Sequence, residues 1–201
     1  MADVPDLFQA APTGRAKCRG CGQPITKGAL RFGESGANPY AEGETHSWFH
    51  LSCGALMRPD KLLPVLEAGA EEVEERAWLA ETARTGLEHP RLPRLLRAER
   101  ASSGRAHCRS CRELIAKGDW RFALQIFEEG RPSPIGTIHV SCAQAYFGTS
   151  HVLSRVRRLP GDLSEQDLTE LEQALSQQRP GLAKTQPPDV EDASRLGSSK
   201  G

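Results

Sequence analysis

The chain has 201 residues, which suits one large domain or two small ones, and only 38% of them are apolar and 5% aromatic. A core this lean is typical of small domains that need a metal ion or disulfides for stability. The formal net charge is zero, the N-terminus lacks the basic start of a signal peptide, and no stretch approaches the roughly 20 apolar residues of a membrane span.

These features predict an intracellular protein that makes no membrane contact. Its compartment would be the nucleus if the source is eukaryotic, and the cytoplasm or nucleoid if it is bacterial. In such compartments cysteines stay reduced and more often bind metal than pair. The six cysteines are therefore candidate metal ligands.

One phrase occurs twice along the chain. "GRAKCRGC", from Gly14, returns as "GRAHCRSC", from Gly104. The similarity continues through "CRGCGQPITKGALRFG" and "CRSCRELIAKGDWRFA", and again at "WFHLSC" and "TIHVSC". A repeat of this length indicates two copies of one structural unit.

Each copy has a Cys-x2-Cys pair, then 28 or 27 residues, then His-x2-Cys. Three thiolates and one imidazole make a closed tetrahedral shell, the pattern of structural rather than catalytic zinc. His46 lies close enough to His50 in sequence to be a rival ligand. We expect two structural Zn²⁺ ions, bound by Cys18, Cys21, His50 and Cys53 in the first copy and by Cys108, Cys111, His139 and Cys142 in the second.

In chain order, a short alternating segment at 29–32 follows a Lys-Gly turn, and a second one at 119–122 follows another. Both predict strands of a small antiparallel sheet. After each His-x2-Cys the apolar spacing becomes helical. In the first copy Pro64 and Gly69 are expected to break the helix into pieces, and in the second a helix should start at Ser164, where Asp167 completes a capping box.

The fold class is therefore α+β, with two small zinc-stapled domains, each a short antiparallel sheet followed by helix. The two ends of the chain are rich in Pro, Gly, Ser or charge and should be disordered. The predicted divisions are a disordered N-terminus at 1–11, the first zinc finger with its helical extension at 12–88, a basic linker at 89–101, the second zinc finger with its extension at 102–178, and a disordered tail at 179–201.

The motifs Gly-Arg-Ala-x-Cys-x2-Cys, Ile-x-Lys-Gly-x2-Arg-Phe and Trp-Phe-His-x2-Cys resemble the zinc finger at the N-terminus of eukaryotic poly(ADP-ribose) polymerases, which is also found in some DNA ligases. The second copy departs from the pattern, with Thr137 and Ile138 where the first has Trp48 and Phe49. The resemblance implies binding to DNA breaks by shape, without reading sequence. It places four arginines against DNA phosphates: Arg15, Arg31, Arg105 and Arg121.

The resemblance also implies an apolar side chain that stacks on the exposed face of the last base pair, from the loop before His-x2-Cys. In the first copy Tyr40 and Ala41 are the nearest candidates, and in the second Ile126 and Phe127. Base stacking of this kind is worth roughly 1–3 kcal/mol per base.

Charge is unevenly distributed along the chain. Residues 14–58 carry six basic against three acidic residues, residues 104–146 six against four, and residues 90–112 seven arginines against one acid. Residues 59–89 instead carry eight acids against three bases. This segregation of sign can create a phosphate-attracting face in a neutral protein, and arginine is the natural residue to grip phosphate.

The chain contains no Gly-rich phosphate loop, no repeated pair of carboxylates and no nucleophile with an evident base, so we expect no enzyme activity. The hypothesis is a tandem zinc-finger protein whose partner is DNA, at nicks, gaps or ends, and whose binding is independent of sequence. One alternative is a protein-interaction adaptor whose acidic segment 59–89 docks a basic partner. The other is a thiol redox or zinc sensor.

Overall fold

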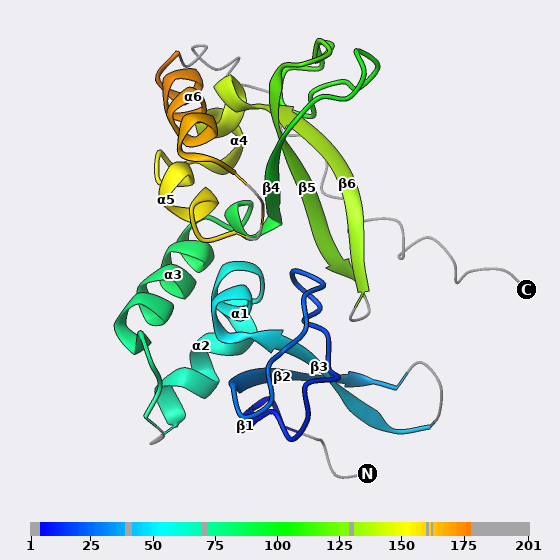
Figure 1. The fold of residues 1–201 in the computed structure, drawn as a ribbon, viewed down its shortest axis with the longest axis vertical. Coiled ribbons are helices and arrows are strands. Elements are labelled where there is room, and N and C mark those ends of the chain that lie inside the picture. The colour runs from blue at the N-terminus through cyan, green and yellow to red at the C-terminus, as the bar shows by residue number, and fades with distance from the viewer. Residues whose placement is uncertain are drawn as a thin grey trace, which may run out of the picture.

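The computed structural model describes residues 5–38, 42–69, 72–128, 131–159, 161 and 163–177. They form two α+β units that follow one another along the chain, so the predicted fold class is confirmed (Figure 1). The elements of the first unit are β1 (Leu7–Ala10), β2 (Leu30–Ala37), β3 (Glu44–His50), α1 (Leu51–Met57), α2 (Pro59–Ala68) and α3 (Arg76–Glu88). The elements of the second are η1 (Leu92–Arg94), β4 (Leu95–Arg100), β5 (Trp120–Glu128), β6 (Arg131–His139), η2 (Val140–Cys142), α4 (Ala143–Phe147), α5 (Val152–Val156) and α6 (Glu165–Ser176).

Each unit is built on a three-stranded antiparallel sheet, in the order β1-β2-β3 and β4-β5-β6. The alternating segments predicted at 29–32 and 119–122 begin the central strands, after the turns at Gly28 and Gly118, where φ is +83° and +89°. Phe32 pairs with Phe49 across the first sheet, and Phe122 pairs with Ile138 across the second. All four side chains are fully buried, so each sheet carries the core of its own unit.

The first strand of each sheet lies outside the predicted boundaries. Leu7–Ala10, in the segment expected to be disordered, forms β1 and pairs with β2. Leu95–Arg100, in the segment expected to be a linker, forms β4 and pairs with β5. Both expectations are therefore wrong at these residues, because β1 is too short to show a clear alternation and the basic side chains of β4 conceal its pairing. The tail at 179–201 lies outside the described residues.

The helical segment of the first unit breaks at one of the two predicted positions. Helix α2 ends before Gly69, as expected, but it runs through Pro64. Proline lacks the N–H that would bond the carbonyl of Asp60, and both residues are exposed, so water can solvate that carbonyl. Pro64 therefore does not break the helix.

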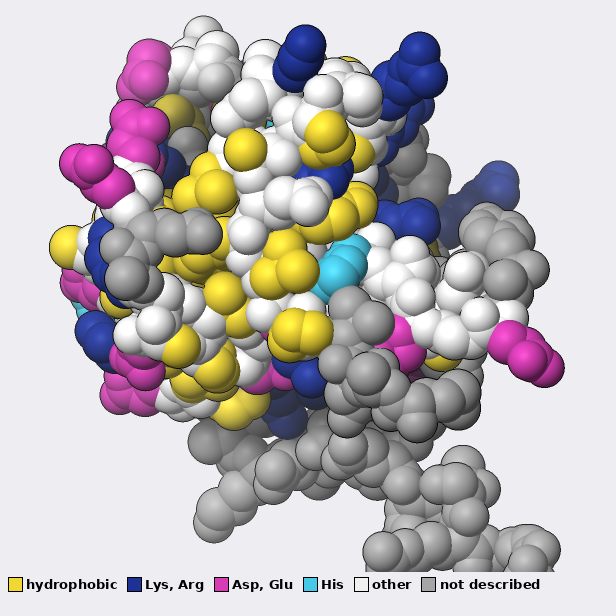
Figure 2. Space-filling model, turned by 90° about the horizontal axis from the view of Figure 1, so that it is seen from below, with side chains coloured by type: hydrophobic (Ala, Val, Ile, Leu, Met, Phe, Trp, Pro, Cys, Tyr) yellow, Lys and Arg dark blue, Asp and Glu magenta, His cyan; other side chains and the backbone are white. Residues whose placement is uncertain are grey.

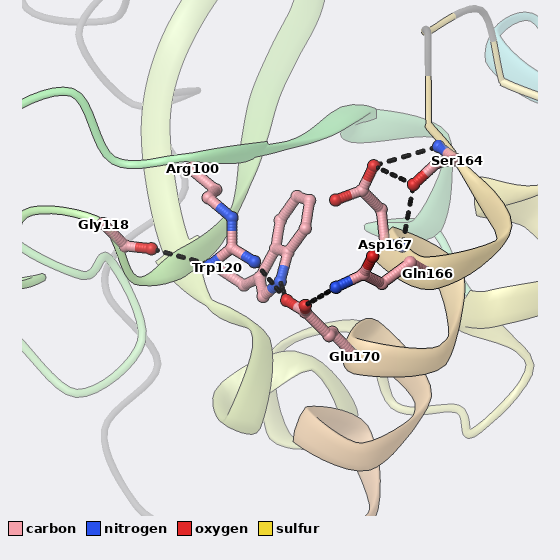
Figure 3. Close-up of polar contacts among 7 residues, drawn as sticks. All are labelled: Arg100, Gly118, Trp120, Ser164, Gln166, Asp167 and Glu170. Atoms are coloured by element: carbon pink, nitrogen blue, oxygen red, sulfur yellow. Dashed lines mark hydrogen bonds and ion pairs between the residues drawn. The ribbon is translucent and has the colours of Figure 1, made fainter.

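Helix α6 starts as predicted and closes over the second sheet (Figure 3). The amide of Asp167 donates to the Ser164 hydroxyl over 3.2 Å, and the amide of Ser164 donates to the Asp167 carboxylate over 2.9 Å, which completes the capping box. One turn later Glu170 accepts from the Trp120 indole over 3.1 Å and from Arg100. Arg100 also lies over the Trp120 ring, so this cation from β4 is held inside the unit.

The two units share a packed boundary. Phe127 of β5 contacts Phe49 of β3 edge-on, with ring centroids 5.6 Å apart. Leu56 and Met57 of α1 belong to the apolar cluster of the second unit. At the outer edge Arg158 lies over the Trp78 ring and pairs with Glu75 at 3.3 Å. The units therefore pack against each other directly and are not joined by a free linker.

Within the described residues, no helix has the length and apolar character needed to cross a membrane.

The turn that closes each Cys-x2-Cys pair supplies a test of local strain. Gly22 adopts φ +74° in the first unit, and Arg112 adopts φ +69° at the matching place in the second. The left-handed region costs a residue with a Cβ about 1–2 kcal/mol, whereas glycine enters it freely but loses more entropy on folding. Arg112→Gly should therefore stabilise the zinc-loaded protein by about 0.5–1 kcal/mol in urea unfolding, net of these two effects.

Gly22→Ala is the matched control and should destabilise the protein, because it introduces a Cβ at the same conformation. An unchanged or lower stability of Arg112→Gly would contradict the strain at this turn.

Candidate metal centres and nucleic-acid interface

Backbone hydrogen bonds shape each Cys-x2-Cys pair into a tight knuckle. In the first unit the amide of Cys18 donates to the Gln23 carbonyl over 2.9 Å, and the amide of Gly22 donates to the Cys18 carbonyl over 2.8 Å. In the second unit the amides of Cys108 and Arg112 make the same two bonds. Each knuckle therefore turns its two sulfur atoms to one side.

The other two ligands come from the junction between the last strand and the segment that follows it. His50 ends β3 and Cys53 lies in the first turn of α1, while His139 ends β6 and Cys142 lies in η2. The amides of Arg19 and Arg109, inside the knuckles, donate to the carbonyls of Trp48 and Thr137 and so hold each knuckle beside the last strand.

The four predicted ligands of each copy come together. Their ligand atoms lie within 4.8 Å of one another in both groups, Cys18, Cys21, His50 and Cys53, and Cys108, Cys111, His139 and Cys142. Nδ1 of His50 is 3.3 Å from the Cys21 sulfur, and Nδ1 of His139 is 3.4 Å from the Cys111 sulfur. The rival His46 lies elsewhere, with Nε2 3.0 Å from the Pro5 carbonyl and its ring against Trp48.

In each centre the surroundings favour the thiolate form of the first cysteine, while the neighbouring sulfurs and burial raise the pKa of Cys53 and Cys142. A hydrogen bond from the Cys53 thiol, helped by backbone amides that include that of His50, lowers the pKa of the Cys18 thiol to about 5 although burial opposes this. The same arrangement around Cys142 and His139 lowers the pKa of Cys108 to about 4. Both sulfurs therefore carry charge at neutral pH.

Backbone carbonyls orient the two histidines. Nε2 of His50 lies 3.3 Å from the Pro24 carbonyl, and Nε2 of His139 lies 3.2 Å from the Leu114 carbonyl. A carbonyl only accepts, so each Nε2 carries the proton and each Nδ1 presents its lone pair to the sulfurs. This outer contact is the usual support of a zinc-binding histidine. Three sulfurs and one nitrogen suit tetrahedral zinc, and all four positions are filled by protein, so the two ions are structural.

The four arginines expected at phosphate fall into two classes. Arg15 and Arg105 are exposed, and among the described residues no hydrogen bond or ion pair holds either guanidinium group. They occupy matching places, each in the loop that leads into a knuckle. The adjacent Lys27 and Lys117 are also exposed, so each unit presents two cations at this end.

Arg31 is instead held inside the first unit. Its side chain is buried, donates to Gln9 Oε1 over 2.6 Å and lies 3.4 Å over the Trp48 ring. Burial lowers the pKa of the Arg31 guanidinium. Gly33 permits this stack, because a Cβ there would lie 2.7 Å from the Trp48 ring.

Arg121 makes the equivalent contact with a charged partner. It donates to Glu99 Oε1 from Nη2 over 2.7 Å and from Nε over 3.0 Å. Glu99 of β4 stands where Gln9 stands in β1, and the second unit has Thr137 where the first has Trp48. A carboxylate therefore replaces the amide beside this arginine, and a threonine replaces the aromatic ring. Sequence reasoning missed Gln9 and Glu99, although both precede the first cysteine of their copy by nine residues.

The candidate stacking residues are placed only in part. Tyr40 and Ala41 lie outside the described residues. Ile126 and Phe127 belong to β5, so the expected loop is a strand there. Phe127 packs against Phe49 and lies 5.5 Å from the Arg58 guanidinium, so its ring is engaged between the units.

The centres predict which histidine holds the metal. His50→Ala should lower the zinc content measured by elemental analysis from two ions per chain to one, because Nδ1 of His50 completes the first centre. It should also abolish the thermal transition of the first unit, since small zinc domains unfold without their ion. His46→Ala, the matched control, should retain two ions. If this variant loses one ion, His46 is a ligand of the first centre and the prediction is contradicted.

Comparison with known proteins supports this description. Residues 9–86 match the family described as "Poly(ADP-ribose) polymerase and DNA-Ligase Zn-finger region". The chain is 26% identical over 148 residues to "Poly [ADP-ribose] polymerase 1" of Gallus gallus, which covers 65% of this chain and 14% of that protein. It is 28% identical over 151 residues to "Poly [ADP-ribose] polymerase 1" of Oryza sativa subsp. japonica, covering 71% of this chain and 15% of that protein.

A third relative, "Poly [ADP-ribose] polymerase" of Sarcophaga peregrina, is 24% identical over 207 residues, covering 86% of this chain and 20% of that protein. The chain thus spans between 14% and 20% of the length of these three relatives. The matched family region contains the first Cys₃His centre, and the repeated motif forms the second. Residues 9–86 are therefore a zinc finger of the poly(ADP-ribose) polymerase and DNA ligase type, and the chain carries two such fingers in tandem.

Proposed function

We propose that this protein is a zinc-dependent DNA-binding protein that recognises nicks, gaps or ends through phosphate contacts, without reading base sequence. The observation that carries the proposal is the pair of matching exposed arginines, Arg15 and Arg105, one beside each zinc knuckle. Arginine offers paired donors to phosphate, and two grips on separate units can hold two stretches of backbone.

The distribution of charge supports the same face. Figure 2 views the molecule from below; most of its acidic side chains lie along the left edge, the side of helices α2 and α3, among a few Lys and Arg side chains, while Lys and Arg side chains predominate toward the upper right. DNA would approach the strand and loop side, away from the acidic helices. Salt-dependent steering follows from such a division of sign, even at zero net charge.

We propose a different role in DNA binding for Arg31 and Arg121. Each already donates to a side chain of the neighbouring strand, Gln9 or Glu99. A direct phosphate contact would require each to leave that partner. We assign primary contact with phosphate to the two exposed arginines, and to Arg31 and Arg121 a secondary contact made after DNA has bound.

The test compares nicked, blunt-ended and closed circular duplexes by fluorescence or filter-binding titration at two salt concentrations. Arg15→Ala and Arg105→Ala should each weaken binding several-fold and lower the slope of log K against log salt by about 0.9, the value for one lost phosphate contact. Arg84→Ala is the matched control: this exposed arginine on α3 pairs with Glu67 on the acidic side and should change neither quantity.

The outcomes separate the parts of the proposal. Equal affinity for closed circular and nicked duplex would refute break recognition while leaving DNA binding intact. If no duplex binds even at low salt, DNA binding fails, and the adaptor role of the acidic segment 59–89 becomes the better explanation.

A further inference from the structure

A cavity of about 360 Å³ lies between the two units, on the helical side of the molecule. Its walls come from one face of α3, from α5 and from the shared apolar boundary. The volume falls at the lower end of the range for small-molecule sites, roughly 300–1,000 Å³.

Arg155 is the unusual member of this wall. Its side chain is only 5% exposed, and neither Nε nor Nη2 has a hydrogen-bond partner. No ion pair with Arg155 occurs among the described residues. Burial lowers the pKa of this guanidinium to about 9. A buried cation without a counter-ion is costly, so an anion that enters the cavity gains a strong interaction.

The rest of the lining suits a small organic molecule. Trp78 offers apolar surface above the buried Leu56 and Leu92, and Thr82, Thr85 and Ser154 offer hydroxyl groups. Glu81 is exposed whereas Arg155 is buried, so the cation lies deeper than the carboxylate. A ligand would therefore place its charged end inward and its apolar body against Trp78.

We propose that this cavity binds a small organic anion, a molecule with one carboxylate or phosphate group on a flat apolar body, through Arg155. The site is separate from the proposed DNA face: α3 and α5 lie on one side of the molecule in Figure 1, and the sheets and the loops that carry the knuckles lie toward the other. Helices of both units form the wall, so the ligand would bridge them.

The test adds three probes of similar shape to the zinc-loaded full chain. Their binding is measured by calorimetry and by the fluorescence of the protein. Benzoate and phenyl phosphate carry the two anionic groups, and benzamide is the neutral counterpart of benzoate. At least one of the two anions should bind about tenfold or more tightly than benzamide, because only the anions can accept charge-assisted hydrogen bonds from Arg155. The preferred anion identifies the source as a carboxylate or a phosphate.

Arg155→Met removes the charge and keeps a long apolar stem. It should abolish the preference for the anion over benzamide, and it should raise the melting temperature of the ligand-free protein, because the unpaired buried charge is gone. Arg157→Met, on the exposed neighbour in the same segment, makes the same change in net charge and should leave anion binding unaltered.

Equal binding of benzamide and both anions to the unaltered protein would overturn the proposal, and this comparison needs no variant to fold. Retention of anion binding by Arg155→Met would also overturn it. A nicked duplex that competes directly with benzoate would identify the oxyanion as a DNA phosphate and refute a separate small-molecule site. If DNA binding fails in the assays above, the proposal that this cavity binds an organic anion still stands.

Discussion

Each unit depends on the four bonds that a zinc ion makes to three sulfurs and one imidazole. The ligands bring together the knuckle, the end of the last strand and the segment after it, which backbone hydrogen bonds among the described residues join only at the strand. Cys18 and Cys53 belong to the same buried cluster as Phe32 and Phe49, so the metal centre is part of the apolar core. Without the ion, the neighbouring Cys18 sulfur and burial raise the pKa of the Cys53 thiol, so the centre would keep protonated thiols joined only by weak hydrogen bonds in place of metal bonds.

Much of this organisation depends on residues that are close together in the sequence. The repeated spacing of Cys-x2-Cys and His-x2-Cys predicts the two groups of four side chains that the fold brings together, because a short turn forces two side chains toward one point. The turns at Gly28 and Gly118 and the cap at Ser164 were also predictable, since each depends on residues within three or four positions. The helix break at Gly69 belongs to the same class.

Features that depend on distant partners were not predictable. Leu7–Ala10 shows no clear alternation, and its pairing with β2 arises only once the second strand exists. The internal contacts of Arg31 and Arg121 depend on the residues opposite them on the first strand of each sheet, Gln9 in one unit and Glu99 in the other. A longer comparison of the two copies would have found the first strand, because Ala11 and Ala101 are both buried and hold the same place before the repeated phrase. No sequence pattern indicates the cavity at Arg155, because its walls come from both units.

The boundary between the fingers has a consequence for the shape of any duplex they hold. Phe127 lies against Phe49, and Met57 packs into the neighbouring core. These contacts fix the orientation of one finger relative to the other, and with it the positions of the exposed arginines on each. A continuous double helix is stiff over lengths well below its persistence length, so it resists bending to fit a fixed angle. An interruption in one strand acts as a joint and lets the two arms of the duplex swing to meet the protein. Under the proposed function, two fingers in a fixed orientation would select damaged DNA by its flexibility, with no contact to the damaged nucleotide itself.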